Sequence, residues 1–229
     1  MFSYYGSKSK IVDMYPTPKF DKIIEPFAGS ARYSLRFWQK DILLVDKYQM
    51  IVDVWHYLQN ASPNDILKLP QINTGDNILN YNLSKDEFNF VILLLQQGTI
   101  GGTKAYEWGV KNYKQSLERI SRNLFKIKHW TIKQGDYIDI ENQNATWFVD
   151  APYEFGGHKY KHSNKHIDFM QLKNFCNTRN GQVIVCENTK ATWMSFKPLK
   201  QMQGIKFKTI EAIWSNQPTN YDYQVLSLF

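Results

Sequence analysis

The sequence predicts an α/β fold with a mostly parallel β-sheet, an antiparallel hairpin at its C-terminal end and a helical insertion. Short apolar runs alternate with helical segments over the first 59 residues. A polar stretch and a basic helical segment follow, after which the alternation resumes. The chain has 229 residues, of which 43% are hydrophobic, enough for one domain with an insertion rather than two independent domains.

The first elements form a β-α-β-α series. We expect strands over 22–25 and 42–45, and helices over 31–39 and 50–59, with Ser30 as the N-cap of the first helix. A helix between two strands brings the chain back to the same edge of the sheet, so these strands are expected to be parallel.

The insertion begins at the polar residues 60–64. Ser84 and Glu87 have the spacing of a capping box, which predicts a helix to about residue 97. A second, basic helix is predicted over 113–127. Its apolar residues recur at spacings of three and four and predict one buried stripe: Leu117, Ile120, Leu124 and Ile127.

After the insertion the α/β pattern returns. The predicted elements are strands over 130–133, 147–149 and 182–186, a helix over 167–178, and a closing pair of strands near 206–213 and 224–228.

A turn of small residues follows the first strand. Glu25-Pro26-Phe27 leads into Ala28-Gly29-Ser30, where the small side chains let a ligand approach the backbone and the following helix offers free amides. The second strand ends in Asp46, a position at which an acidic residue commonly holds ribose hydroxyls. A purely structural turn and a helix-capping aspartate remain the alternatives.

A carboxylate, a rigid turn and an aromatic ring follow the apolar run 147–149, as Asp150-Ala151-Pro152-Tyr153. Asp150 and the carbonyl of Ala151 could accept the two hydrogens of a base amine, while Tyr153 stacks on the base. Pro152 fixes the turn and keeps Ala151 extended. Taken alone, an ordinary turn is the simpler interpretation.

The order of these motifs resembles that of a known family. Tyr-x-Gly-x-Lys at the start, Glu-Pro-Phe-x-Gly, an aspartate after the second strand and a late Asp-x-Pro-Tyr are similar to the DNA adenine methylase (Dam-like, D12 class) family of S-adenosylmethionine-dependent methyltransferases. The resemblance covers nearly the whole chain. It implies a Rossmann-like methyltransferase sheet, with residues 1–59 and 130–229 as the catalytic domain and 60–129 as an inserted target-recognition segment.

The resemblance also implies roles for individual residues. Asp150, Ala151, Pro152 and Tyr153 would be catalytic, acting on a flipped adenine. The segment around Asp136 is placed like the family's adenine-contacting acidic turn. The residues implied to bind S-adenosylmethionine are Tyr5, Gly6, Lys8, Glu25, Pro26, Phe27, Ala28, Gly29, Ser30, Asp46, Asp136, Tyr137 and Asp150.

Two residues depart from the family pattern. Ala151 stands where a proline is usual, and Ala31 where a second glycine is common. Because the acceptor at position 151 is a backbone carbonyl, alanine keeps it. The implied function is site-specific methylation of adenine N6 in DNA. The alternatives are a weakened, methyltransferase-like DNA-binding subunit that acts with a partner, and an RNA adenine methyltransferase.

The charge distribution favours double-stranded DNA as a partner. The chain carries a net charge of +7, and residues 98–133 contain eight basic and two acidic residues. A solvated helix face is the plainer alternative. The predicted DNA contacts are Lys104, Lys111, Lys114, Arg119, Arg122, Lys159 and Lys161.

Other classes of protein are not indicated. The two cysteines, Cys176 and Cys186, lack metal-ligand spacing, and with no secretory signal they favour a cytoplasmic protein. The histidines at 158, 162 and 166 have no accompanying carboxylate, so no metal is predicted. The longest aliphatic run is too short to span a membrane. The sequence leaves open a monomer, a homodimer or a heterodimer.

Overall fold

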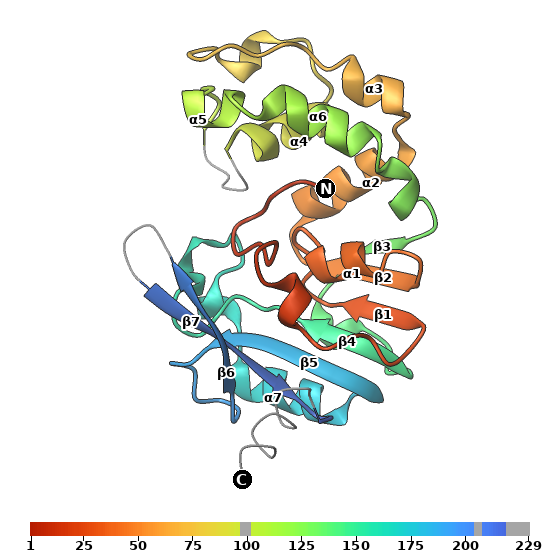
Figure 1. The fold of residues 1–229 in the computed structure, drawn as a ribbon, viewed down its shortest axis with the longest axis vertical. Coiled ribbons are helices and arrows are strands. Elements are labelled where there is room, and N and C mark those ends of the chain that lie inside the picture. The colour runs from red at the N-terminus through yellow and green to blue at the C-terminus, as the bar shows by residue number, and fades with distance from the viewer. Residues whose placement is uncertain (97–101, 204–207, 219–229) are drawn as a thin grey trace.

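The computed structural model describes residues 1–96, 102–203 and 208–218, without the side chains of Lys159, Met202, Gln203 and Lys208. One seven-stranded sheet, in the order β3-β2-β1-β4-β5-β7-β6, forms its centre (Figure 1). Strands β1 to β5 run parallel, and β7 is antiparallel to both β5 and β6. This mostly parallel sheet with an antiparallel C-terminal hairpin is a Rossmann-like methyltransferase fold, as predicted.

The strands are short and their central members are apolar. Every residue of β4 is buried, which explains why it reads in the sequence as a continuous apolar run. The strand bounds are β1 Lys22–Glu25, β2 Asp41–Asp46, β3 Thr131–Gln134, β4 Ala145–Val149, β5 Gly181–Asn188, β6 Lys197–Gln203 and β7 Lys208–Ser215.

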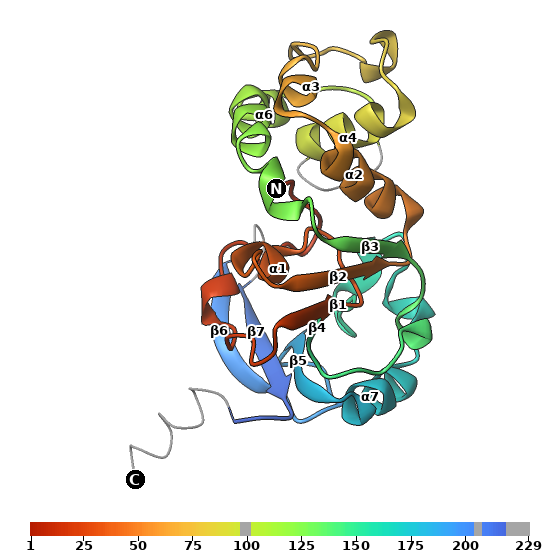
Figure 2. The same cartoon turned by 90° about the vertical axis from the view of Figure 1, so that its right-hand side faces the viewer.

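Helices cover both faces of the sheet. On one face lie α1 (Arg32–Arg36) and α2 (Gln49–Asn60), and on the other lies α7 (Phe169–Thr178) (Figure 2). Alternate strand residues therefore enter two separate cores: Phe148 stacks on Tyr33 of α1 with ring centroids 4.2 Å apart, whereas Trp147 meets Phe175 of α7 edge to face.

The middle of the chain forms a helical layer beside α2 and β3 (Figures 1 and 2). It comprises α3 (Pro63–Leu67), α4 (Lys85–Leu95), α5 (Glu107–Val110) and α6 (Tyr113–Ser121). Its buried side chains are continuous with the core around α2. The capping box at Ser84 is confirmed, since Ser84 and Glu87 bond each other's backbone amides. The boundaries of a separate recognition segment stay a prediction.

Several element bounds differ from those predicted. The basic helix ends at Ser121 instead of 127, because the Asn123 side chain bonds the Arg119 carbonyl and a 3-10 helix, Leu124–Ile127, follows. The four residues of its apolar stripe are nevertheless buried. Helix α1 is shorter than predicted and Ser30 is not its cap: Ala31 holds the N-cap position, and the Ser30 hydroxyl bonds Ser7 instead.

The closing hairpin lies earlier in the sequence than predicted. It consists of β6 and β7, so the partner of the 208–215 strand precedes it. Pro198 and a largely polar pattern obscured β6, because proline in a strand is compatible only with an edge position, which β6 occupies. The strand predicted near 224–228 lies outside the described residues. Within the described part of the chain, no helix is both long enough and apolar enough to cross a membrane.

Candidate functional site

A pocket opens at the carboxyl ends of β1, β2, β3 and β4, where the strand order reverses between β1 and β4. The space within it, together with the open solvent at its mouth, amounts to about 930 Å³. Ligand sites of open α/β sheets lie at such a reversal. All the residues predicted to bind a cofactor line this pocket: Tyr5, Gly6, Lys8, Glu25, Pro26, Phe27, Ala28, Gly29, Ser30, Asp46, Asp136, Tyr137 and Asp150.

The turn after β1 is anchored by Asp46. The amide of Gly29 donates to Asp46 Oδ2 at 2.9 Å, and the amide of Tyr48 donates to Oδ1 at 2.9 Å. Gly29 has a φ of +44°, and a side chain there would come within 3.2 Å of the Tyr4 ring. Glycine is therefore favoured at this position by both backbone conformation and space.

Two carboxyl groups flank the turn, Glu25, which is buried, and Asp46, which is partly buried. Burial raises the pKa of Asp46 to about 6, although the amide hydrogen bonds from Gly29 and Tyr48 oppose the shift. Glu25 is fully buried and accepts a hydrogen bond from the amide of Ser34 at 2.7 Å. Burial raises the pKa of Glu25 to about 8. Both carboxyls thus fix backbone at the pocket, and each oxygen of Asp46 has a lone pair left for a ligand.

The wall formed after β3 is acidic and aromatic. Asp136 lies 2.6 Å from the ammonium group of Lys47. The ring of Tyr137 packs against that of Phe27, with centroids 5.3 Å apart, and its hydroxyl donates to Gln171 at 2.9 Å. Asp136 therefore lies at the pocket wall while Tyr137 is held by its neighbours.

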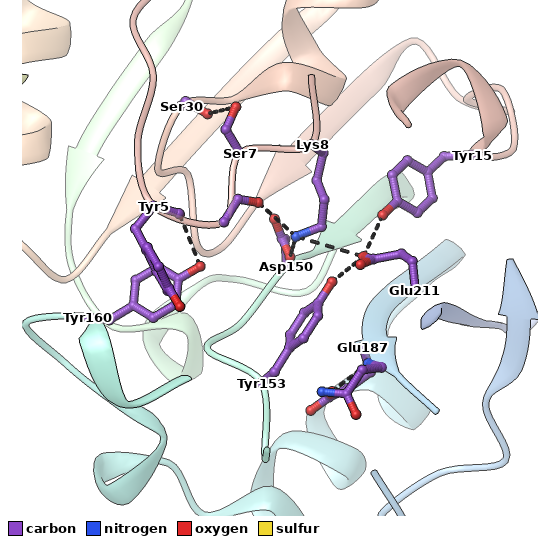
Figure 3. A network of polar contacts seen from close by, with 12 residues as sticks. Tyr5, Ser7, Lys8, Tyr15, Ser30, Asp150, Tyr153, Tyr160, Glu187 and Glu211 are labelled. Carbon is purple, nitrogen blue, oxygen red and sulfur yellow. Dashed lines mark hydrogen bonds and ion pairs between the residues drawn. The ribbon is translucent and has the colours of Figure 1, made fainter. Parts of the chain in front are cut away.

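Lys8 and Asp150 form a buried ion pair at the floor of the site (Figure 3). Lys8 Nζ lies 2.6 Å from Asp150 Oδ1 and 3.8 Å from Glu211 Oε1, and it donates to the Gly6 carbonyl at 3.0 Å. Burial opposes the charge on Lys8, but the two carboxylates outweigh it and raise its pKa. Burial raises the pKa of Asp150, and the Lys8 ammonium opposes that shift.

Tyr153 lies in the segment that follows β4, and its side chain points toward Glu211 of β7 (Figure 3). Its hydroxyl donates to Glu211 Oε1, which also accepts a hydrogen bond from Tyr15 at 2.9 Å. Lys8 Nζ lies over the Tyr153 ring, 4.8 Å from its centroid. Of the predicted catalytic residues, Asp150 and Pro152 line the pocket, whereas Ala151 and Tyr153 are not among its lining residues.

The segment after Tyr153 is tied back to the sheet and to the N-terminus. The amide of Glu154 donates to Glu187 Oε1 at 2.5 Å. The Tyr160 hydroxyl donates to the Tyr5 carbonyl at 3.0 Å, and a side chain on Gly6 would overlap that hydroxyl. Burial raises the pKa of Glu187 to about 7. This segment therefore covers one side of the pocket.

The predicted DNA contacts are not part of the pocket lining. Lys104 to Arg122 project from the helical layer, and Lys161 from the segment after Tyr153. The exposed members are Lys104, Lys111, Lys114, Arg119, Arg122 and Lys161, and none of them lines the pocket. The side chain of Lys159 is outside the described structure.

Some residues of the site carried no motif. Glu211 accepts hydrogen bonds from Tyr15 and Tyr153, yet Glu211 and Tyr15 lie in segments whose sequence shows no signature. Tyr48 could have been found, because it follows Asp46 by two residues at the same strand end. The pocket residues not predicted from the sequence include Tyr4, Ser7, Arg32, Lys47, Tyr48, Tyr160, His162 and His166.

No protein-family model and no curated protein matches the chain. Solved structures do resemble it at low sequence identity. A conserved hypothetical protein from Streptococcus pyogenes is 10% identical, with a TM-score of 0.37 and 86% of each chain covered. A protein from Haemophilus influenzae described as a putative methylase is 11% identical, with a TM-score of 0.37 and 86% of this chain and 87% of the other covered. A putative methyltransferase from Escherichia coli is 7% identical, with a TM-score of 0.34 and coverage of 90% and 78%.

Proposed function

We propose that the protein is an S-adenosylmethionine-dependent methyltransferase that methylates the N6 amine of adenine in DNA. The observation that carries this proposal is the convergence in one pocket of five segments far apart in the sequence. Each contributes the residues that the motifs single out: Gly6 and Lys8, the turn at Gly29, Asp46, Asp136 and Asp150. The carboxyl ends of neighbouring parallel strands meet in any such sheet, but Gly6 and Lys8 belong to no strand and still reach the same pocket.

The residues of the pocket fit an adenosine-type cofactor. Asp46 has oxygen lone pairs for ribose hydroxyls, and Asp136 is an acceptor in a pocket that the aromatic groups of Phe27 and Tyr48 also line. The backbone at Gly29 is open to close approach. When bound, S-adenosylmethionine supplies a methyl group activated by its sulfonium.

The end of β4 would hold the methyl acceptor. Asp150 and the carbonyl of Ala151 would accept the two amine hydrogens, which directs the nitrogen lone pair at the methyl group. Pro152 keeps the turn rigid. Glu211 fixes the Tyr153 ring and Lys8 covers one of its faces, so the opposite face is the one proposed to stack on the base.

The predicted DNA contacts complete the proposal. Six exposed basic side chains on the helical layer and the 154–166 segment would bind phosphates around the target adenine. Such contacts make affinity depend on salt but do not define the target sequence.

Methyl transfer from labelled S-adenosylmethionine tests the function. The purified protein is incubated with duplex DNA, single-stranded DNA and RNA of mixed sequence, and the labelled nucleosides are identified after digestion. Label in N6-methyladenine of duplex DNA supports the proposal, whereas label mainly in RNA would favour the RNA enzyme. DNA binding without transfer, even when a partner protein is added, would favour a binding subunit.

A further inference from the structure

Arg32 is a pocket residue to which no motif assigns a role. It is the first residue of α1, directly after the turn at Gly29, and it lines the pocket. Its Nε donates to the Ser7 hydroxyl at 3.1 Å and its Nη2 donates to the Phe2 carbonyl at 2.6 Å. Among the described residues Nη1 makes no hydrogen bond, so the guanidinium is held in place with donors to spare.

The charge of Arg32 is also without a partner. No carboxylate in the described part of the chain comes within 4.0 Å of it, whereas Lys8 faces Asp150 and Glu211, and Lys47 faces Asp136. Burial and the charge of Arg119 lower the pKa of Arg32 to about 10, which leaves it protonated at neutral pH. An unpaired, largely buried cation is costly unless a ligand supplies the opposite charge.

We propose that Arg32 binds an anionic oxygen group of the ligand at the turn end of the pocket. This inference rests on the proposed function. A guanidinium matches a carboxylate or a phosphate with paired N–H donors. The anionic group that the geometry favours is the carboxylate at the amino-acid end of the cofactor. Arg32 lines the pocket together with Ser30 and Ala31, whereas the exposed basic residues of the helical layer do not line it.

Calorimetric titration with two ligands tests the carboxylate assignment. S-adenosylhomocysteine carries the amino-acid group, and 5′-methylthioadenosine lacks it. For Arg32→Gln we expect an affinity for S-adenosylhomocysteine lower by about ten- to a hundredfold, the loss typical of a charged hydrogen bond, and an affinity for methylthioadenosine within about twofold of wild type. The affinity of Arg32→Lys for S-adenosylhomocysteine should lie between those of wild type and Arg32→Gln.

Arg36→Gln is the matched control. Arg36 lies on the same helix but pairs with Asp13, so its loss should leave both affinities unchanged. Equal weakening of both ligands by Arg32→Gln would indicate a distorted pocket and overturn the carboxylate assignment.

Titration with duplex DNA at two salt concentrations tests the other possible anion, a phosphate of the nucleic acid. A lower DNA affinity with a smaller salt dependence in Arg32→Gln, together with unchanged S-adenosylhomocysteine binding, would assign the site to a nucleic-acid phosphate. No change with either ligand would overturn the anion site. If the wild-type protein itself fails to bind S-adenosylhomocysteine, the proposed function fails before any variant is compared, and the DNA titration alone then decides the role of Arg32.

Discussion

The ammonium group of Lys8 lies 2.6 Å from the carboxylate of Asp150, which joins the N-terminal segment to the end of β4 inside the protein. The same ammonium lies 3.8 Å from Glu211 on β7. Three segments distant in the sequence are thus fixed around one buried cation. Removing a single member of such a cluster leaves the others with uncompensated charge, so its members should be sensitive to substitution.

Glu211→Ala should destabilise the fold. It leaves the hydroxyls of Tyr15 and Tyr153 without their acceptor, and we expect a loss of about 3 kcal/mol in the free energy of unfolding. Glu211→Gln keeps an oxygen acceptor and should cost about half as much. Urea denaturation measures both, with the exposed Glu141→Ala as the control expected within about 0.5 kcal/mol of wild type. Equal stability of Glu211→Ala and wild type would contradict the network.

Gly6→Ala should weaken cofactor binding by about tenfold or more. Gly6 has a φ of +76°, and its added methyl would overlap the Tyr160 hydroxyl. Titration with S-adenosylhomocysteine measures the effect, and in a Tyr160→Phe background the loss should be smaller. Gly75→Ala is the control, because Gly75 has a φ of +96° but an added methyl there would meet no atom within 4 Å. The same loss in both glycine variants would show that the Tyr160 contact is irrelevant.

Glu25 should make stability fall as the pH rises. Its pKa is raised from 4.5 to about 8 in the folded protein, so the folded state binds the proton more tightly than the unfolded state. Its stabilising contribution is full below pH 4.5 and is lost as the pH rises through about 8. Relative to Glu25→Gln, the wild type should lose on the order of a few kcal/mol between pH 5 and pH 8. Parallel pH profiles in urea denaturation would refute this assignment.

Ala151→Pro should leave methyl transfer unchanged or raise it by less than about tenfold. Pro152 already holds residue 151 extended, so the added ring contributes only on the order of 1 kcal/mol of preorganisation. No hydrogen bond from the Ala151 amide is found among the described residues, so proline removes no donor from the fold. Steady-state rates on duplex DNA measure the effect. An increase of several orders of magnitude would instead identify the natural chain as a silenced enzyme.

The sequence was informative where one local pattern dictates one structure. The apolar run of β4, the small residues around Gly29 and the capping box at Ser84 each depend on neighbours in the chain, and each was predicted correctly in type. The fold class followed from their order, because alternating strands and helices favour a parallel sheet.

The remaining features depend on contacts between distant segments. Nothing local marks Glu211 as the acceptor for Tyr153, or Tyr160 as the neighbour of Gly6. The Lys8–Asp150 pair likewise exists only because the N-terminal segment folds across the end of β4. Strand β6 also depends on a distant contact, since its pairing with β7 compensates for a polar sequence that contains proline.

The single-turnover rate of Asp150→Asn, together with Asp150→Ala, tests most directly the claim that Asp150 activates the adenine amine. Asp150→Ala should transfer the methyl group at least about a hundredfold more slowly, since loss of one such acceptor is worth on the order of 3 kcal/mol. Asp150→Asn keeps an oxygen acceptor without the charge and should be slowed less. The affinity of both variants for S-adenosylhomocysteine should stay within about threefold of wild type. Asp41→Ala is the control and should react like wild type, because Asp41 is the first residue of β2, at the end of that strand away from the pocket. A wild-type rate of N6-methyladenine formation in the Asp150 variants would contradict the proposed mechanism.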